Sequence, residues 1–161
     1  MTRTSATGTR LAAAGFTLLE LLVVVAIAGT VLAVAAVNLF PSQEENARRE
    51  TALLALDLEA ARDAAWFGGS PAAVVLDGGR VRALSLSTSR QWTPVANRER
   101  ALGDAVRVTA LAVDGTPLAM KDPIVFLPDG LGVPFRVEIE AHGLARAIEG
   151  DAAGAIRVVA R

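Results

Sequence analysis

The feature that most constrains this chain is an uncharged, apolar stretch close to its start. Residues 21–40 read LLVVVAIAGTVLAVAAVNLF, and no residue from 21 to 41 is charged. A helix needs about 20 consecutive apolar residues to cross the hydrocarbon layer of a bilayer. The stretch therefore predicts a membrane-spanning helix, and it accounts for a hydrophobic content of 52%, which is high for a soluble protein.

Charges on either side of this stretch predict its orientation. Arg3 and Arg10 precede it in a segment without acidic residues, and Glu44 and Glu45 follow it. Cytoplasmic flanks of membrane helices carry an excess of Lys and Arg. We therefore expect a single pass, with the N-terminus in the cytoplasm and everything beyond residue 41 outside it. Residues 1–15 are rich in small and hydroxyl side chains, which is typical of a targeting segment rather than of folded structure.

One acidic residue, Glu20, stands at the head of the apolar stretch. An ionised carboxylate costs about 2.5 to 3.5 kcal/mol at the middle of a membrane, and less near the interface. A cation would offset that cost. If the chain were cut just before Phe16, the new terminal ammonium would lie about one helical turn from Glu20. The geometry favours a contact between Glu20 of one subunit and the Phe16 amine of its neighbour, which would set the register of an assembly.

The sequence GFTLLELLVVVAIAGT resembles the prepilin peptidase signature shared by type IV pilins and type II secretion pseudopilins. Gly15, Phe16 and Glu20 match its defining positions. The resemblance implies that a prepilin peptidase cuts between Gly15 and Phe16, that the amine of Phe16 is then methylated, and that Glu20 supports assembly. Residues 1–15 would be the prepilin leader peptide, and residues 16–40 the transmembrane and assembly helix.

Two simpler interpretations compete with this one. The first is an ordinary signal peptide, cut after Ala35 at the small-residue site Ala33-Val34-Ala35. The second is a plain membrane anchor in which Glu20 is an incidental polar residue near the interface. Neither explains why Gly15, Phe16 and Glu20 occur together.

Residues 42–67 predict an amphipathic second helix. Ser42 and Glu45 fit a capping box, and Gly68 is a stop signal at the other end. The apolar residues that share one face are Leu54, Leu58, Ala61 and Ala65. Together with the apolar stretch, this segment predicts one long helix over residues 16–67 that can restart after Pro41.

Residues 72–161 predict an antiparallel sheet that covers the apolar face of this helix. The expected strands are AAVVLD, RVRALSL, AVRVTALAV, IVFL, FRVEIEA and AIRVVA. In FRVEIEA the alternation is clean, with Phe135, Val137 and Ile139 on one face. Residues 87–103 lack periodicity and are expected to form a loop.

The stretch FLPDGLGVPFRVEIEAHG, residues 126–143, resembles the C-terminal pattern of the GspH/FimT family of minor pseudopilins and minor pilins. The resemblance implies an α+β, pilin-like fold, in which a long N-terminal helix, membrane-spanning in its first half, packs against an antiparallel β-sheet domain. Residues 41–161 would be the periplasmic domain of a protein held in the bacterial inner membrane until it enters a pseudopilus.

The two resemblances together imply a minor pseudopilin of a type II secretion system, a structural subunit at or near the pseudopilus tip that serves protein export. Its partners would be the prepilin peptidase, other minor and major pseudopilins, and the inner-membrane secretion platform. One alternative is a minor type IV pilin, similar to FimT, for pilus assembly, adhesion or DNA uptake. Another is a periplasmic ligand-binding domain on a membrane anchor.

Nothing in the sequence predicts an enzyme, a metal site or a cofactor. Cysteine is absent, and His142 is the single histidine, placed before Gly143 as in a turn. Glu59 and Asp63 share a helix face, but the spacing suggests no third ligand, so a solvated face is expected.

A nucleic-acid partner is not expected either. Without Arg3 and Arg10, fourteen basic side chains face seventeen acidic ones, a net side-chain charge of −3 that suits phosphate poorly. The alternative is a local basic patch near the C-terminus, formed by Arg146, Arg157 and Arg161.

Overall fold

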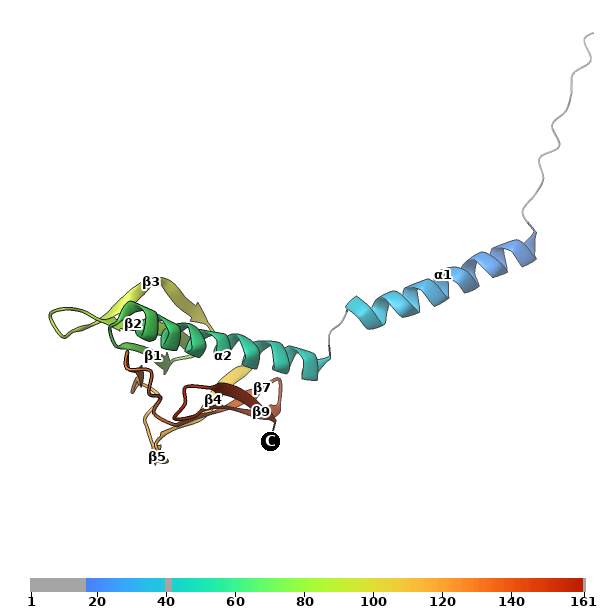
Figure 1. The fold of residues 1–161 in the computed structure, drawn as a ribbon. Coiled ribbons are helices and arrows are strands. Elements are labelled where there is room, and N and C mark those ends of the chain that lie inside the picture. Colours follow the sequence, from blue (N-terminus) through green and yellow to red (C-terminus); the bar gives the residue numbers. More distant parts are fainter. Residues whose placement is uncertain (1–16, 40–41, 161) are drawn as a thin grey trace, which may run out of the picture. The chain divides into compact units, whose positions relative to one another are not determined.

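The computed structural model describes residues 17–39 and 42–160, and its ribbon is drawn in Figure 1. The chain divides into two compact units, Met1–Pro41 and Ser42–Arg161. The described part of the first unit is helix α1 (Leu18–Leu39), and that of the second is helix α2 (Gln43–Gly68) with nine strands. The expected helix over residues 16–67, with its possible restart after Pro41, thus corresponds to two described helices. Pro41, where we expected the helix to restart, lies outside the described residues.

Helix α2 starts and stops through the local signals that its sequence carries. The hydroxyl of Ser42 accepts a hydrogen bond from the Glu45 N–H at 3.1 Å, which satisfies one of the free donors of the first turn. At the other end Gly69 adopts a left-handed conformation, with φ at 65°, and its N–H donates to the Ala65 carbonyl. On the exposed side, two ion pairs at i,i+4 spacing join Glu44 to Arg48 and Glu45 to Arg49.

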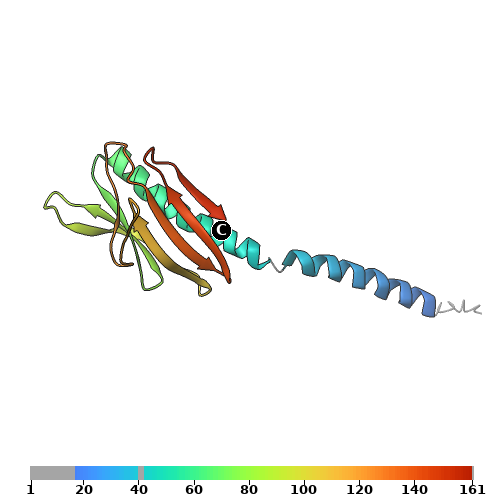
Figure 2. The same ribbon diagram turned by 90° about the horizontal axis from the view of Figure 1, so that it is seen from below.

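The strands form two antiparallel sheets rather than one. Sheet A contains, in spatial order, β3 (Trp92–Ala101), β2 (Arg80–Leu86), β1 (Ala72–Asp77) and β6 (Ile124–Phe126). Sheet B contains, in the same sense, β5 (Thr116–Pro117), β4 (Val106–Val113), β7 (Phe135–Ala141), β8 (Leu144–Gly150) and β9 (Ile156–Ala160). Helix α2 packs against strands of both sheets, and Figure 2 shows it running behind sheet B. The predicted α+β class, with a helix on antiparallel strands, is confirmed.

The core lies between the helix and the sheets. Leu54 and Leu58 of α2 are fully buried, as are Val137 and Ile139 of β7. The alternation of apolar and polar residues in β7 therefore predicted correctly which of its side chains are buried. The two sheets also meet directly, because the rings of Phe126 in β6 and Phe135 in β7 pack edge to face with centroids 5.9 Å apart.

Tight turns join the strands of the hairpins, and two of these turns bear on the sequence predictions. In each, two residues with positive φ join the strands, as a turn matched to the twist of a hairpin requires. Gly78 and Gly79 connect β1 to β2, with φ at 57° and 73°. His142 and Gly143 connect β7 to β8, with φ at 51° and 78°. The interpretation of His142 as a turn residue is confirmed.

The expected loop over residues 87–103 is wrong for most of its length, because residues 92–101 form strand β3. This strand lies at the edge of sheet A and pairs only with β2 among the described residues. Both of its faces are largely exposed, so it needs no apolar alternation. Asn97 also has a φ of 58°, which interrupts the regular strand geometry. A strand without a buried face leaves no periodic signal in the sequence.

Strand β8, with the sequence LARAIEG, was not among the expected strands. Its Ala, Leu, Arg and Glu residues favour helices when taken alone. Its central place between β7 and β9, with Ile148 fully buried, holds it extended. Tertiary pairing therefore overrides local propensity here.

The close approach of β8 to β7 yields a test of the core. Gly150 lies opposite Phe135, and a Cβ at Gly150 would overlap the Phe135 ring. We expect Gly150→Ala to lower the free energy of unfolding by about 2 kcal/mol, since overpacking a buried site costs about 1–3 kcal/mol. Gly68→Ala is the matched control: open space surrounds Gly68 at the end of α2, so the change should be neutral or stabilising. Urea denaturation of the full chain in detergent, followed by tryptophan fluorescence, measures both. Equal midpoints for the two variants would contradict the packing described here.

Candidate functional site

The surface of helix α1 is apolar on every side. All its side chains from Leu18 to Val34 are exposed within the structure. The window Leu18–Ala35 has a mean hydropathy of 2.6, and it is the one segment of the described chain that is long and apolar enough to cross a membrane. The hydroxyl of Thr30 is satisfied within the helix, because it donates to the Ile27 carbonyl at 2.8 Å. A helix that is hydrophobic all round needs either lipid or other helices around it.

Glu20 is the single charged residue of α1 and lies in its first turn. Its N–H donates to the Thr17 carbonyl at 3.1 Å and lies 3.2 Å from the Thr17 hydroxyl oxygen. Glu20 thus belongs to the first turn of the helix, where a negative charge is favoured by the helix dipole. Within the described residues Glu20 has no ion-pair partner. The site is thus an exposed carboxylate on an apolar rod, open to a cation from elsewhere.

Gly15 and Phe16, the other two residues of the motif, lie outside the described residues. Cleavage between them and methylation of Phe16 therefore stay predictions.

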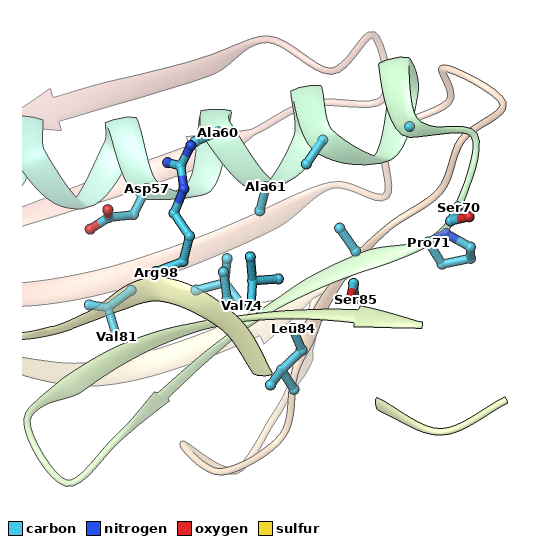
Figure 3. A pocket seen from close by; sticks show the side chains of 15 residues that line it. Asp57, Ala60, Ala61, Ser70, Pro71, Val74, Val81, Leu84, Ser85 and Arg98 are labelled. Atoms are coloured by element: carbon cyan, nitrogen blue, oxygen red, sulfur yellow. The ribbon is translucent and has the colours of Figure 1, made fainter. Parts of the chain in front are cut away.

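Sequence reasoning missed a groove in the second unit, shown in Figure 3. It has a volume of about 320 Å³ and lies between the second half of α2 and strands β2 and β3. Ala60, Ala64 and Gly68 line it from the helix, and Leu84 and Val95 line it from the sheet. Because these helix side chains are so small, α2 and sheet A do not close against each other here. Only the tertiary arrangement brings the two walls together.

An arginine of β3 ties this edge strand to the helix. The Arg100 Nε donates to a carboxylate oxygen of Asp57 at 2.7 Å, and its Nη1 lies 4.0 Å from Glu50. All three side chains are about 70% buried. Arg100 was missed because its segment was expected to be a loop.

Other residues that could carry chemistry have structural roles. Arg62 donates to the carboxylate of Asp63 at 2.9 Å and stacks over the Trp66 ring at 5.2 Å. In the part of the chain that the structure describes, no three acidic or histidine side chains come together as a metal site would need.

The basic residues near the C-terminus do not form an open patch. Arg157 pairs with Asp151 at 2.9 Å, and the side chain of Arg146 is only 10% exposed, at 4.0 Å from Glu44. Arg161 lies outside the described residues. Two of the three cations that we considered for nucleic acid are therefore already engaged.

Comparison with known families agrees with this arrangement. The prokaryotic N-terminal methylation motif matches residues 10–36, the segment that contains Glu20 and most of α1. The model of the type II transport protein GspH family matches residues 50–154, which is most of the chain. The chain belongs to the GspH family. The resemblance drawn from residues 126–143 is confirmed.

Solved structures show the same fold in GspH-type proteins. The minor pseudopilin EpsH from the type 2 secretion system of Vibrio cholerae matches in two structures, each with a TM-score of 0.58. Sequence identities are 18% and 16%, over 71% and 73% of this chain and 97% of EpsH in both cases. The solution structure of Escherichia coli GspH matches with a TM-score of 0.55 and 16% identity, over 71% of this chain and 88% of that protein. Among curated proteins, no sequence matches.

The Arg100 contacts predict how β3 is held in this GspH-family domain. Arg100→Leu should lower the free energy of unfolding by about 1.5–3 kcal/mol, because hydrogen bonds to charged groups are worth about that much and two largely buried carboxylates lose their cation. Arg82→Leu is the control, since its ion pair with Asp77 is long, at 3.9 Å, and well exposed. That variant should stay within about 0.5 kcal/mol of the parent. Urea denaturation compares them; an Arg100 variant as stable as the Arg82 variant would show that the bridge contributes nothing.

Proposed function

We propose that this protein is a minor pseudopilin of a type II secretion system, a structural subunit at or near the tip of the pseudopilus. One observation carries the proposal: a methylation motif, with Glu20 on an apolar helix, precedes a GspH domain in the same chain. A motif of this kind prepares a helix for assembly, and the domain supplies the surface that the assembly presents. The EpsH structure, described as that of a minor pseudopilin from a type 2 secretion system, supports the same role.

Assembly follows from the electrostatics of the N-terminal helix. The chain enters the inner membrane with its leader, residues 1–15, in the cytoplasm. A prepilin peptidase cuts between Gly15 and Phe16, and the new Phe16 amine is methylated. In the low dielectric of the membrane, the Glu20 carboxylate of one subunit and the Phe16 ammonium of its neighbour attract strongly. That contact lets an apolar helix leave lipid and stack against other helices in a fixed register.

The second unit has a mechanical task in this scheme, not a catalytic one. Its helix and two sheets form a rigid body with a continuous core, in which Leu54, Leu58 and Ile148 are fully buried. It lies in the periplasm and makes the contacts with other minor and major pseudopilins. The peptidase and the inner-membrane secretion platform act on the first unit and on the growing base.

The role of Glu20 can be tested with a nearly isosteric change. Glu20→Gln removes the charge and lowers the cost of leaving the helix in lipid, so the protein should accumulate in the inner membrane, correctly cut. Its recovery in sheared pseudopili should fall about tenfold or more, which corresponds to ~1.4 kcal/mol or more of lost contact energy.

Glu20→Asp is the control for this experiment, because it keeps the charge on a shorter side chain. It should assemble better than the Gln variant. If Glu20→Gln were recovered in pseudopili at the wild-type level, the proposed charge contact would be ruled out.

Gene deletion separates secretion from pilus functions. Deleting the gene should abolish export of secreted enzymes into the medium, because the subunit belongs to the export apparatus, while twitching and DNA transformation continue. Complementation with the wild-type gene should restore export. Normal export together with lost twitching or transformation would instead assign the protein to a type IV pilus.

A further inference from the structure

The exposed side of α2 carries an unpartnered apolar stripe. Leu53, Leu56 and Phe67 expose 46%, 56% and 88% of their surface. Contiguous apolar patches of this kind mark interaction sites on soluble domains. Ala60 and Ala64 lie between them in the sequence. Steps of three and four residues separate these five positions, so they fall within about a quarter of the helix circumference.

The stripe borders the groove. Ala60 and Ala64 belong to both, since they also line the groove wall. Beyond them the groove is closed by sheet A, where Leu84 and Val95 form the opposite wall. The stripe and the groove therefore make one continuous apolar surface, with large side chains at the two ends and small ones in the middle. Its hollow centre can receive side chains from outside.

Among the described residues that line the groove, Arg98 is the one cation. Figure 3 shows Arg98 reaching from β3 toward α2 near Ala60. Arg98 is exposed, and within residues 17–39 and 42–160 it makes neither an ion pair nor a hydrogen bond. The nearest acidic residue on the groove wall, Asp57, is already bound to Arg100 at 2.7 Å. The surface thus offers apolar contact along a helix and one charge that a ligand could satisfy.

We propose that this surface docks an amphipathic α-helix of another pseudopilus subunit, which places apolar side chains in the groove and a carboxylate against Arg98. The proposal rests on the proposed function and names the contact surface. A helix fits because apolar residues at i, i+3, i+4 and i+7 on one helix complement the same spacing on another. Alanines at the centre allow the two backbones to approach closely. The free cation then selects a partner that is acidic at that point, since rim charges steer and discriminate among partners.

Photo-crosslinking in the native cell tests this on the full chain. The probe p-benzoylphenylalanine replaces Leu56 in one variant and Phe67 in a second, and Thr109, exposed on β4 of sheet B, in a control. We expect both stripe positions, and not Thr109, to form adducts that mass spectrometry maps to a helix of another subunit. The mapped helix should have apolar residues at three- and four-residue spacing and an Asp or Glu within one turn.

Charge reversal tests the role of Arg98. Arg98→Glu should lower the adduct yield at Leu56 and Phe67 about fivefold, the effect of losing one favourable rim charge and gaining a repulsive one. Arg90→Glu, on the exposed turn between β2 and β3, should leave the yield unchanged. Replacing the mapped carboxylate of the partner by Lys should restore the yield with Arg98→Glu.

The other outcomes overturn the proposal. They are adducts to a second copy of this chain, to residues 18–39 of the same chain, to lipid, or to a strand or loop of a partner. The absence of adducts at both stripe positions, in cells where the protein is cut and present at its normal level, overturns it too. Enzyme export is measured in the same cells. If export depends on the protein while the stripe finds no helix, the docking surface fails and the secretion role stands.

Discussion

The proposed function depends on one constraint, which is that helix α1 carries a single carboxylate on an otherwise apolar surface. Glu20 is the single charge of α1, and every side chain from Leu18 to Val34 is exposed within the structure. Such a helix is unstable in water and carries an uncompensated charge in lipid. The contact that we propose, with a cation on a neighbouring helix, would relieve both problems together. In the proposed function, that contact is what makes the chain a component of an assembly.

The second unit is built so that assembly does not disturb its fold. Buried residues of α2, among them Leu54 and Leu58, pack against both sheets, and the Phe126–Phe135 contact joins the sheets to each other. Arg100 pins the otherwise exposed edge strand β3 to Asp57 of the helix. The opposite side of the same helix keeps Leu56 and Phe67 in solvent. One helix thereby holds the domain together with one face and remains available to partners with another.

The sequence predicted those parts of the structure that rest on local signals. The capping serine Ser42, the turn at His142 and the inward face of β7 were all predicted, because capping, positive φ and two-residue alternation leave local marks. Strand β3 has no periodic sequence pattern because neither of its faces is buried. Strand β8 was not predicted because its residues prefer helices. The Arg100 bridge joins residues 43 positions apart, and the groove brings α2 against strands β2 and β3, so no local pattern could reveal either of them.

The central claim is that a newly exposed amine at Phe16 neutralises Glu20 in the assembled protein. Mass spectrometry of the N-terminal peptide, taken from pseudopili rather than from whole cells, tests it most directly. The account predicts a chain that begins at N-methylated Phe16. A functional, assembled chain that still carries residues 1–15, or one that begins at Ala36 after removal of a conventional signal peptide, would contradict it.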